Sequence, residues 1–333
     1  MDYTLRFWVE HMTPAEVAER ATELLREYSA GVNVAVHGST LTDESARALA
    51  GFRRAGIETA CWLLLDREEG YFPNERNVGL YVERAREFVR WADANGVLPD
   101  LVAVDLELPY GQMMSLAEGT PGEKARRALA ILRENRDPTR YREARESLSR
   151  LNGWLQERGM RTIAAILPWV ALELEGPSEL LQDLMETPVA GIEWDILSPM
   201  WYASMFEGMS GGAISQRDAN WLTYDSCLWL KTRYGRRAGV SLGVTGTGVM
   251  GNEKAFREPG ELLAGVEAAL AAGVRDISVY NLEGVLADNE PRRWMEALRG
   301  ARPRVPEKSE RAARVLALLR TAFPLVRRVA GSS

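Results

Sequence analysis

The stretch DLVAVDLEL at residues 100–108 is an aliphatic run that carries two acidic residues, Asp105 and Glu107, near its end. Successive side chains of a β-strand point to opposite faces, so the residues of this run divide into two sets. From residue 102 onward the even-numbered positions hold only Val and Leu, whereas the odd-numbered positions end in the two carboxylates. The run therefore predicts a strand with an aliphatic outer face and an inner face that is acidic at its C-terminal end.

Seven further apolar runs have a similar length, and a helix-like segment follows each of the eight. Thr13-Pro14, for example, has Glu16 at capping-box spacing. Strand–helix alternation repeated eight times is typical of a closed parallel barrel. We therefore predict a single (β/α)8 barrel, the TIM-barrel fold, across residues 1–333, with strands at Leu5–Val9, Val32–His37, Ile57–Asp66, Leu101–Leu108, Arg161–Trp169, Asp195–Tyr202, Ala238–Thr245 and Asp276–Leu282.

The regular spacing is interrupted in two places. Residues 110–158 are long enough for additional helices after the fourth strand, with a break expected at Arg136-Asp137-Pro138. Residues 300–333 add a terminal helix and a tail. Glycines before several strands suit the C-terminal caps of the preceding helices, and they are Gly31, Gly56, Gly96, Gly159, Gly239 and Gly273.

The composition is that of an ordinary globular protein. Of 333 residues, 46% are hydrophobic and 26% are charged, and the formal net charge is −6. This charge gives no general attraction to nucleic acid or to anionic membranes, so neither is an expected partner. The N-terminus lacks the pattern of a secretory signal and no apolar run is long enough to span a bilayer, which favours a cytoplasmic protein.

Asp105 and Glu107 are the strongest candidates for chemistry. Two residues apart on one strand face, their Cβ atoms are about 7 Å apart. Two partly buried carboxylates at this separation cannot both ionise freely, so the pKa of one should rise. A carboxyl with a raised pKa can act as a general acid near neutral pH. The alternative is a structural pair that Arg or Lys side chains neutralise inside the barrel mouth.

Residues 100–107 resemble the fourth-strand signature of family 18 glycoside hydrolases, the chitinase-like group. Asp105 and Glu107 match the last Asp and the Glu of that signature, whereas Ala103 replaces its middle Asp. The segment Met200-Trp-Tyr202 resembles the Met-x-Tyr of the family's sixth strand, with Ala203 in place of the Asp that follows. Residues 277–284 are similar to its last strand, with Tyr280 at the usual Trp position. The family's third-strand Ser-x-Gly-Gly motif is missing.

The resemblance implies a hydrolase that cleaves N-acetylhexosamine-containing glycans with help from the substrate's own acetamido group. Glu107 would be the general acid, Asp105 would orient the acetamido group and stabilise the positive intermediate, and Tyr202 would hydrogen-bond the same group. Because Ala103 removes a partner that could share the proton of Asp105, the substitution favours an ionised Asp105.

Other side chains near the predicted strand ends are expected to bind the substrate. Aromatic rings stack on sugars, and polar groups orient them. Neither a His-x-His nor a His-Glu-x-x-His pattern occurs, so no metal ion or other cofactor is expected. The expected substrate-binding residues are Trp8, Glu10, His37, Asp66, Trp169, Met200, Trp201, Tyr280 and Glu283.

Two further functions remain open. The first is a barrel that binds carbohydrate without cleaving it. The second is an enzyme for a phosphorylated small molecule, because residues 246–251 read Gly-x-Gly-x-x-Gly after the seventh strand, where barrels often bind phosphate. A glycine-rich loop at the edge of the cleft explains the same residues without a ligand.

Overall fold

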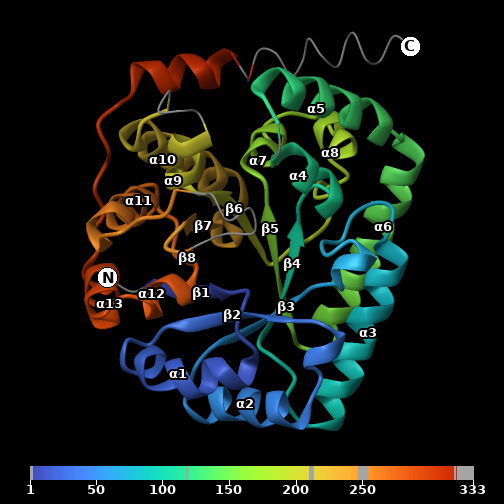
Figure 1. Ribbon diagram of the computed structural model, residues 1–333, viewed down its shortest axis with the longest axis vertical. Coiled ribbons are helices and arrows are strands. Elements are labelled where there is room, and N and C mark those ends of the chain that lie inside the picture. Colours follow the sequence, from blue (N-terminus) through green and yellow to red (C-terminus); the bar gives the residue numbers. More distant parts are fainter. Residues whose placement is uncertain (1–2, 118, 210–213, 247–253, 319, 321–333) are drawn as a thin grey trace.

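The computed structural model describes residues 3–117, 119–209, 214–246, 254–318 and 320. Eight parallel strands pair in chain order, and β1 also pairs with β8, which closes the barrel (Figure 1). The predicted single-domain (β/α)8 barrel is confirmed. Its strands are β1 (Thr4–Val9), β2 (Gly31–Val36), β3 (Thr59–Leu63), β4 (Leu101–Leu106), β5 (Arg161–Ile166), β6 (Ile196–Trp201), β7 (Gly239–Gly243) and β8 (Asp276–Tyr280).

Helices surround the barrel, and α3 packs beside α6 along one side of it (Figure 1). The segment between β4 and β5 contains α4, α5 and α6, which is the elaborated connection expected from the sequence. Residues 310–318 are helical, in the predicted C-terminal extension. The α-helices are α1 (Pro14–Glu27), α2 (Asp43–Arg54), α3 (Val78–Ala94), α4 (Tyr110–Ala117), α5 (Pro121–Asn135), α6 (Pro138–Gln156), α7 (Pro168–Glu173), α8 (Leu180–Leu184), α9 (Ala203–Met209), α10 (Gln216–Tyr234), α11 (Pro259–Ala271), α12 (Leu282–Leu286) and α13 (Pro291–Gly300).

Local sequence signals explain several helix boundaries. Thr13 and Glu16 form a capping box at the start of α1. The break predicted at Asp137-Pro138 is present, because Asp137 accepts hydrogen bonds from the first turn of α6. Within the described residues, no helix combines the length and the hydropathy needed to cross a membrane.

The glycines before the strands fall into two groups. Gly56, Gly96, Gly159 and Gly273 have positive φ angles, as expected for residues that follow a helix end. Gly31 and Gly239 are instead the first residues of β2 and β7, so the prediction that they cap helices is wrong. A Cβ at Gly239 would lie 2.7 Å from Ile196 Cγ2, so close packing requires glycine there.

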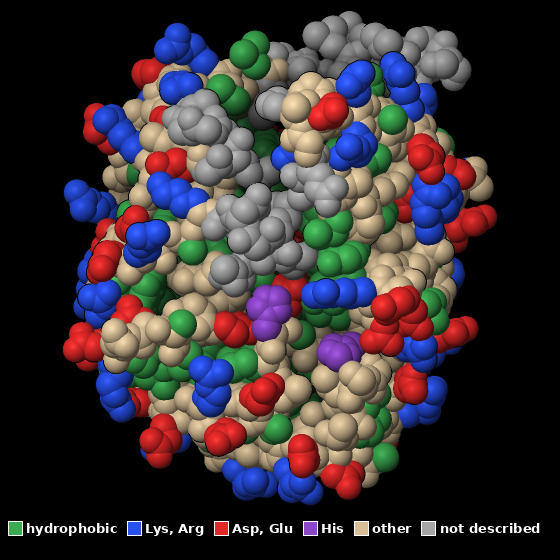
Figure 2. All heavy atoms as spheres, in the orientation of Figure 1, with side chains coloured by type: hydrophobic (Ala, Val, Ile, Leu, Met, Phe, Trp, Pro, Cys, Tyr) green, Lys and Arg blue, Asp and Glu red, His purple; other side chains and the backbone are tan. Residues whose placement is uncertain are grey.

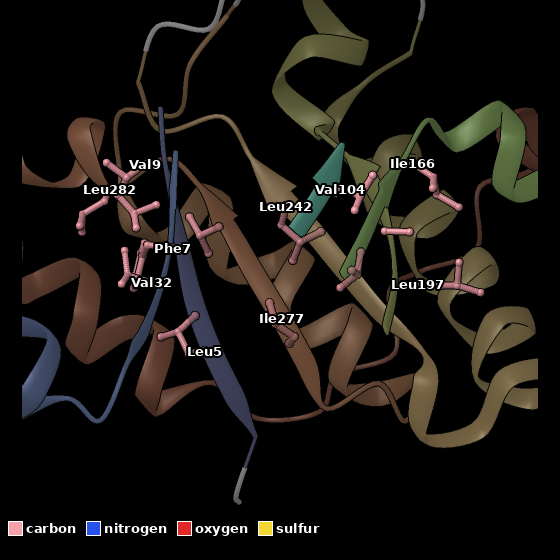
Figure 3. Packing of buried hydrophobic residues seen from close by; sticks show 14 of the residues in the cluster. Leu5, Phe7, Val9, Val32, Val104, Ile166, Leu197, Leu242, Ile277 and Leu282 are labelled. Carbon is pink, nitrogen blue, oxygen red and sulfur yellow. The ribbon is translucent and has the colours of Figure 1, made fainter. Parts of the chain in front are cut away.

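The strand alternation produces two hydrophobic clusters. The outer cluster joins one face of each strand to the helices, and Figure 3 shows this packing with Phe7, Val104 and Leu242 among its residues. The inner cluster fills the barrel with the opposite set, including Trp8, Ala103 and Met200. Side chains from both faces of every strand are therefore buried, as in other parallel barrels.

Most strands end before the apolar runs do. His37, Asp66, Glu107 and Tyr202 all follow the last residue of their strands. The chain turns at these points into loops, 3-10 turns or short helices, such as the turns Gly38–Thr40 and Arg67–Glu69. The two-residue alternation consequently stops, and it no longer decides where these side chains point.

At the opposite, N-terminal end of the barrel, a buried cation connects three strand regions. The Arg6 side chain on β1 is fully buried and forms ion pairs with Glu58 and with Asp276 on β8. The exposed Arg161 on β5 pairs with the same Glu58 at 2.5 Å. A buried charge needs its partners much more than an exposed one does, because it has no water to replace them.

We therefore expect Arg6→Met to lower the free energy of unfolding by about 3 kcal/mol, because it leaves two carboxylates without their buried partner. Arg161→Met removes an exposed partner of Glu58 and should cost less than about 1 kcal/mol. Denaturant unfolding of both variants measures the difference. Equal losses would contradict a special role for the buried arginine.

Candidate active site

A cavity of about 270 Å³ opens where the C-terminal ends of the strands meet. Active sites of TIM-barrel enzymes occupy this end. The wall combines carboxyl groups, tyrosines, tryptophans and methionines. It is formed by Trp8, Glu10, Trp62, Phe72, Asp105, Glu107, Leu108, Met113, Leu116, Ala165, Leu167, Pro168, Trp169, Met185, Met200, Tyr202, Met205, Phe206 and Tyr280.

Inward-facing strand residues form the deep part of the cavity. Trp8 on β1 packs edge-to-face on Trp62 of β3, with ring centroids 5.1 Å apart. Its Nε1 donates a hydrogen bond of 3.0 Å to Ser241 Oγ on β7, and Ser241 lies 2.8 Å from the hydroxyl of Ser198 on β6. The small polar residues inside the barrel thus hold the indole in place. The Trp8 indole nitrogen in the floor is therefore satisfied, whereas that of Trp62 has no hydrogen-bond partner among the described residues.

Asp105 is 4% exposed and lines the cavity from β4. Its Oδ1 atom is buried and has no hydrogen-bond partner among the described residues. Burial raises the pKa of Asp105 well above its ordinary value, and the charges of Glu107 and Glu10 raise it further. This direction runs against the expectation that the Ala103 substitution favours an ionised Asp105.

Glu107 follows the end of β4 and is partly buried at the cavity wall. Burial, followed by the negative charge of Glu10, raises the pKa of Glu107 to about 8. The carboxyl consequently keeps its proton near neutral pH. A protonated carboxyl that faces a cavity is suited to give a proton to a bound molecule.

Glu10 follows β1 and is held from three sides. The hydroxyl of Tyr71 donates a 2.8 Å hydrogen bond to Glu10 Oε1, and that of Tyr280 donates to Oε2. The Glu283 carboxylate accepts hydrogen bonds of 2.8 Å from the backbone N–H groups of Glu10 and His11. The Glu10 carboxylate is thereby fixed in the cavity wall.

Tyr202 and Tyr280 lie near each other on the same wall, with ring centroids 5.6 Å apart. Burial is the main cause that raises the pKa of both phenols, and nearby carboxylates add to it. Both hydroxyls therefore stay protonated and can donate hydrogen bonds. Trp169, which is 37% exposed, lines the cavity at the start of α7 and packs against Phe206.

Of the residues predicted to act or bind, eight line the cavity: Asp105, Glu107, Tyr202, Trp8, Glu10, Trp169, Met200 and Tyr280. Their common location is a structural result, and their chemical roles remain predictions.

His37 and Asp66 do not belong to this cavity, which corrects the expectation that they do. His37 borders a separate small cavity beside Tyr81 and Arg84. Its Nδ1 lies 3.8 Å from a carboxylate oxygen of the exposed Asp66. Both residues follow strand ends where the chain has already turned outward. Figure 2 shows the chain's two histidines at the surface, with acidic side chains near them.

Trp201 and Glu283 also lie outside the lining. Trp201 has the opposite strand parity to Met200, so its ring belongs to the outer cluster. The centroid of this ring lies 5.5 Å from that of the Phe206 ring. Glu283 lies in the first turn of α12, and its carboxylate accepts hydrogen bonds from backbone N–H groups. The Glu283 carboxylate thereby holds the backbone at Glu10 in place.

Several lining residues were not predicted. Trp62 could have been found, because it lies on the inner parity of β3. Met113 and Leu116 on α4 and Met185 after α8 carry no sequence signal that separates them from core residues. The glycine-rich segment at residues 246–251, considered as a phosphate site, lies outside the described residues except for Gly246.

Within the described part of the chain, no cluster of three or more His, Cys, Asp or Glu side chains has a geometry that could hold a metal ion. The carboxyl groups of the cavity are surrounded by aromatic and aliphatic side chains. Their arrangement supports proton transfer and hydrogen bonding by the side chains themselves.

Comparison with known proteins gives the fold. No protein-family model and no curated protein matches the sequence. The PgaB (BpsB) glycoside hydrolase domain from Bordetella bronchiseptica has a TM-score of 0.56 at 10% identity, covering 90% of this chain and 99% of that one. A family 1 β-glucosidase from Thermotoga maritima has a TM-score of 0.53 at 10% identity, and the match covers 84% of this chain and 88% of that one. A C-terminal domain ascribed to a chitinase of Desulfitobacterium hafniense DCB-2 has a TM-score of 0.52 at 10% identity, and the match covers 91% of this chain and 100% of that one. These glycoside hydrolase structures share the TIM-barrel fold with this chain.

The raised pKa of Glu107 predicts a pH-dependent effect on stability. The folded protein binds this proton more tightly than the unfolded chain does. The stabilising contribution is therefore complete below the ordinary glutamate pKa and is lost as the pH rises through about 8. Glu107→Gln stays neutral and avoids this loss.

The melting temperature of Glu107→Gln relative to the natural protein should accordingly increase between about pH 5 and about pH 9. Thermal unfolding at both pH values measures this, and Asp105→Asn should change in the same direction. A difference that does not depend on pH would show that Glu107 titrates as it does in water.

Proposed function

We propose that the protein is a glycoside hydrolase that acts on N-acetylhexosamine-containing glycans. The observation that carries this proposal is the pair Asp105 and Glu107, two carboxyls with raised pKa values that line one aromatic cavity at the C-terminal end of the barrel. Tryptophan and tyrosine side chains around the pair offer flat surfaces for sugar rings.

In the proposed reaction, the proton of Glu107 passes to the glycosidic oxygen while the bond to the anomeric carbon breaks. The acetamido oxygen of the substrate attacks that carbon and forms a positively charged oxazolinium ring. Asp105 accepts a hydrogen bond from the acetamido N–H and stabilises the positive charge. The acetamido N–H donor and the developing positive charge lower the pKa of Asp105, whose proton passes to solvent water as the substrate binds, so the carboxyl is ionised when the intermediate forms.

The second half of the reaction restores the enzyme. The ionised Glu107 takes a proton from a water molecule, whose oxygen attacks the anomeric carbon and reopens the ring. The anomeric configuration is retained, as expected for substrate assistance. Tyr202 holds the acetamido group with its neutral phenol, and Trp169 supports a sugar at the open side of the cavity.

The general-acid role predicts a dependence on the leaving group. Glu107→Gln keeps the shape of the cavity and removes the proton, so kcat/KM should fall by roughly 10²–10⁴ on N-acetylglucosaminides with poor leaving groups. Aryl glycosides with acidic leaving groups need little protonation and should lose much less. Asp105→Asn should reduce kcat/KM alike on both kinds of substrate, because the proposed role of Asp105 is to stabilise the intermediate.

Equal losses on both substrate types for Glu107→Gln would remove Glu107 from the acid role. Absence of turnover by the natural protein over a broad glycoside panel, together with ligand-induced thermal stabilisation, would favour a carbohydrate-binding barrel. The exposed Asp66, outside the cavity, provides the control, and Asp66→Asn should leave both rates near those of the natural protein.

A further inference from the structure

Among the described residues, the ionisable side chains that line the cavity and can carry a charge near neutral pH are all acidic. Its lining includes three carboxyl groups, those of Glu10, Asp105 and Glu107, and within the described residues it includes no Lys, Arg or His. The other lining side chains are aromatic or aliphatic. The mechanism proposed above uses Asp105 and Glu107 and gives no task to Glu10.

Glu10 is built to receive another hydrogen-bond donor. A carboxylate has about four acceptor positions, and the hydroxyls of Tyr71 and Tyr280 occupy one on each oxygen. Acceptor capacity therefore remains on Glu10, which lines the cavity. Because Glu283 fixes the backbone at Glu10, the carboxylate does not have to be ordered when a ligand arrives.

A second observation also calls for a donor. Asp105 is 4% exposed, and its Oδ1 has no hydrogen-bond partner among the described residues. A buried acceptor without a partner is costly, so a ligand that brings donors gains from meeting it. Two positions in one cavity thus favour a ligand rich in N–H groups.

The surroundings of Glu10 leave this negative charge available. The guanidinium of Arg67 lies 5.9 Å from the ring centroid of Tyr71 and 5.7 Å from that of Tyr110, but Arg67 is exposed and does not line the cavity. His11 meets the Glu283 carboxylate through its backbone. Tyr71 and Tyr280 touch Glu10 through neutral phenols.

We propose that the cavity binds a glycan with a free, protonated amine, and that Glu10 is the residue that recognises the ammonium group. This inference rests on the proposed glycosidase function and makes its substrate class narrower. The substrate would be a partly de-N-acetylated hexosamine polymer, with an acetamido group beside Asp105 and an ammonium group beside Glu10.

The physical basis is the difference between an amine and its acetylated form. An ammonium group gives charge-assisted hydrogen bonds to a carboxylate and is attracted to the faces of aromatic rings. An acetamido group at the same position is neutral, is larger and offers one donor. The three carboxyls and the aromatic lining therefore favour the free amine.

Binding without turnover tests the assignment. In a Glu107→Gln background, calorimetry at about pH 6, where the amine is protonated, compares an N-acetylglucosamine trimer with the same trimer that has one amine free. The free-amine trimer should bind more tightly. Adding Glu10→Gln should weaken its binding roughly 10- to 100-fold, the range for a hydrogen bond to a charged group, and should scarcely change the all-acetyl trimer.

Two further variants make the test specific. Asp66→Asn removes one negative charge outside the cavity and should preserve the preference for the free-amine trimer. If Asp66→Asn weakens the binding of this trimer as much as Glu10→Gln does, the preference comes from the overall negative charge of the protein and not from Glu10. Tyr71→Phe removes one hydrogen bond to Glu10 and should weaken the free-amine trimer in the same direction, by a smaller factor. Tyr71→Phe can take the place of Glu10→Gln in this test if Glu10→Gln has a much lower melting temperature than the natural protein.

Equal weakening of both trimers by Glu10→Gln, or no preference for the free amine at the start, would overturn the assignment. Neither result depends on catalysis. Turnover of fully acetylated substrates without an amine preference would support the glycosidase and reject the role of Glu10. Amine-selective binding without any turnover would do the reverse.

Discussion

The alternation of side chains along eight parallel strands is the constraint on which the rest of this structure depends. Closing the sheet makes one parity the barrel interior and the other the surface beneath the helices. Phe7 and Val104 thus reach the outer cluster, whereas Trp8 and Asp105 reach the inner one. Because all strands run in the same direction, the interior side chains nearest their ends gather at one mouth.

The same constraint explains how far the sequence could predict the site. Inside a strand the parity holds, and it correctly placed Asp105 on the inner face. Beyond a strand end the parity has no meaning, so His37 was placed in the wrong cavity. Trp201 could have been excluded, since it alternates with Met200. Met185 could not have been found, because its position depends on the packing of distant helices.

One wall of the cavity depends on a polar network behind it. Arg76 from the β3–α3 loop pairs with the buried Glu186 at 2.6 Å, and Arg140 on α6 pairs with Glu75 at 3.2 Å. These contacts join α6 to the β3–α3 loop and that loop to the segment that carries Met185, which lines the cavity. Ion pairs outside the cavity, one of them from α6 of the elaborated connection, thus help to fix the position of the apolar wall at Met185.

Gathering three carboxyls at one mouth disfavours the folded state, and the cavity limits this cost by giving the groups different partners. Burial raises the pKa of Asp105 and of Glu107, and the charge of Glu10 raises both further, which favours their protonated forms. Glu10 has two phenol donors and a supported backbone. The negative charge of Glu10 is itself one cause of the raised pKa of Glu107. An ammonium group bound to Glu10 would weaken this effect and make the Glu107 proton easier to release, so recognition of an amine and activation of the acid would be linked through the same charge.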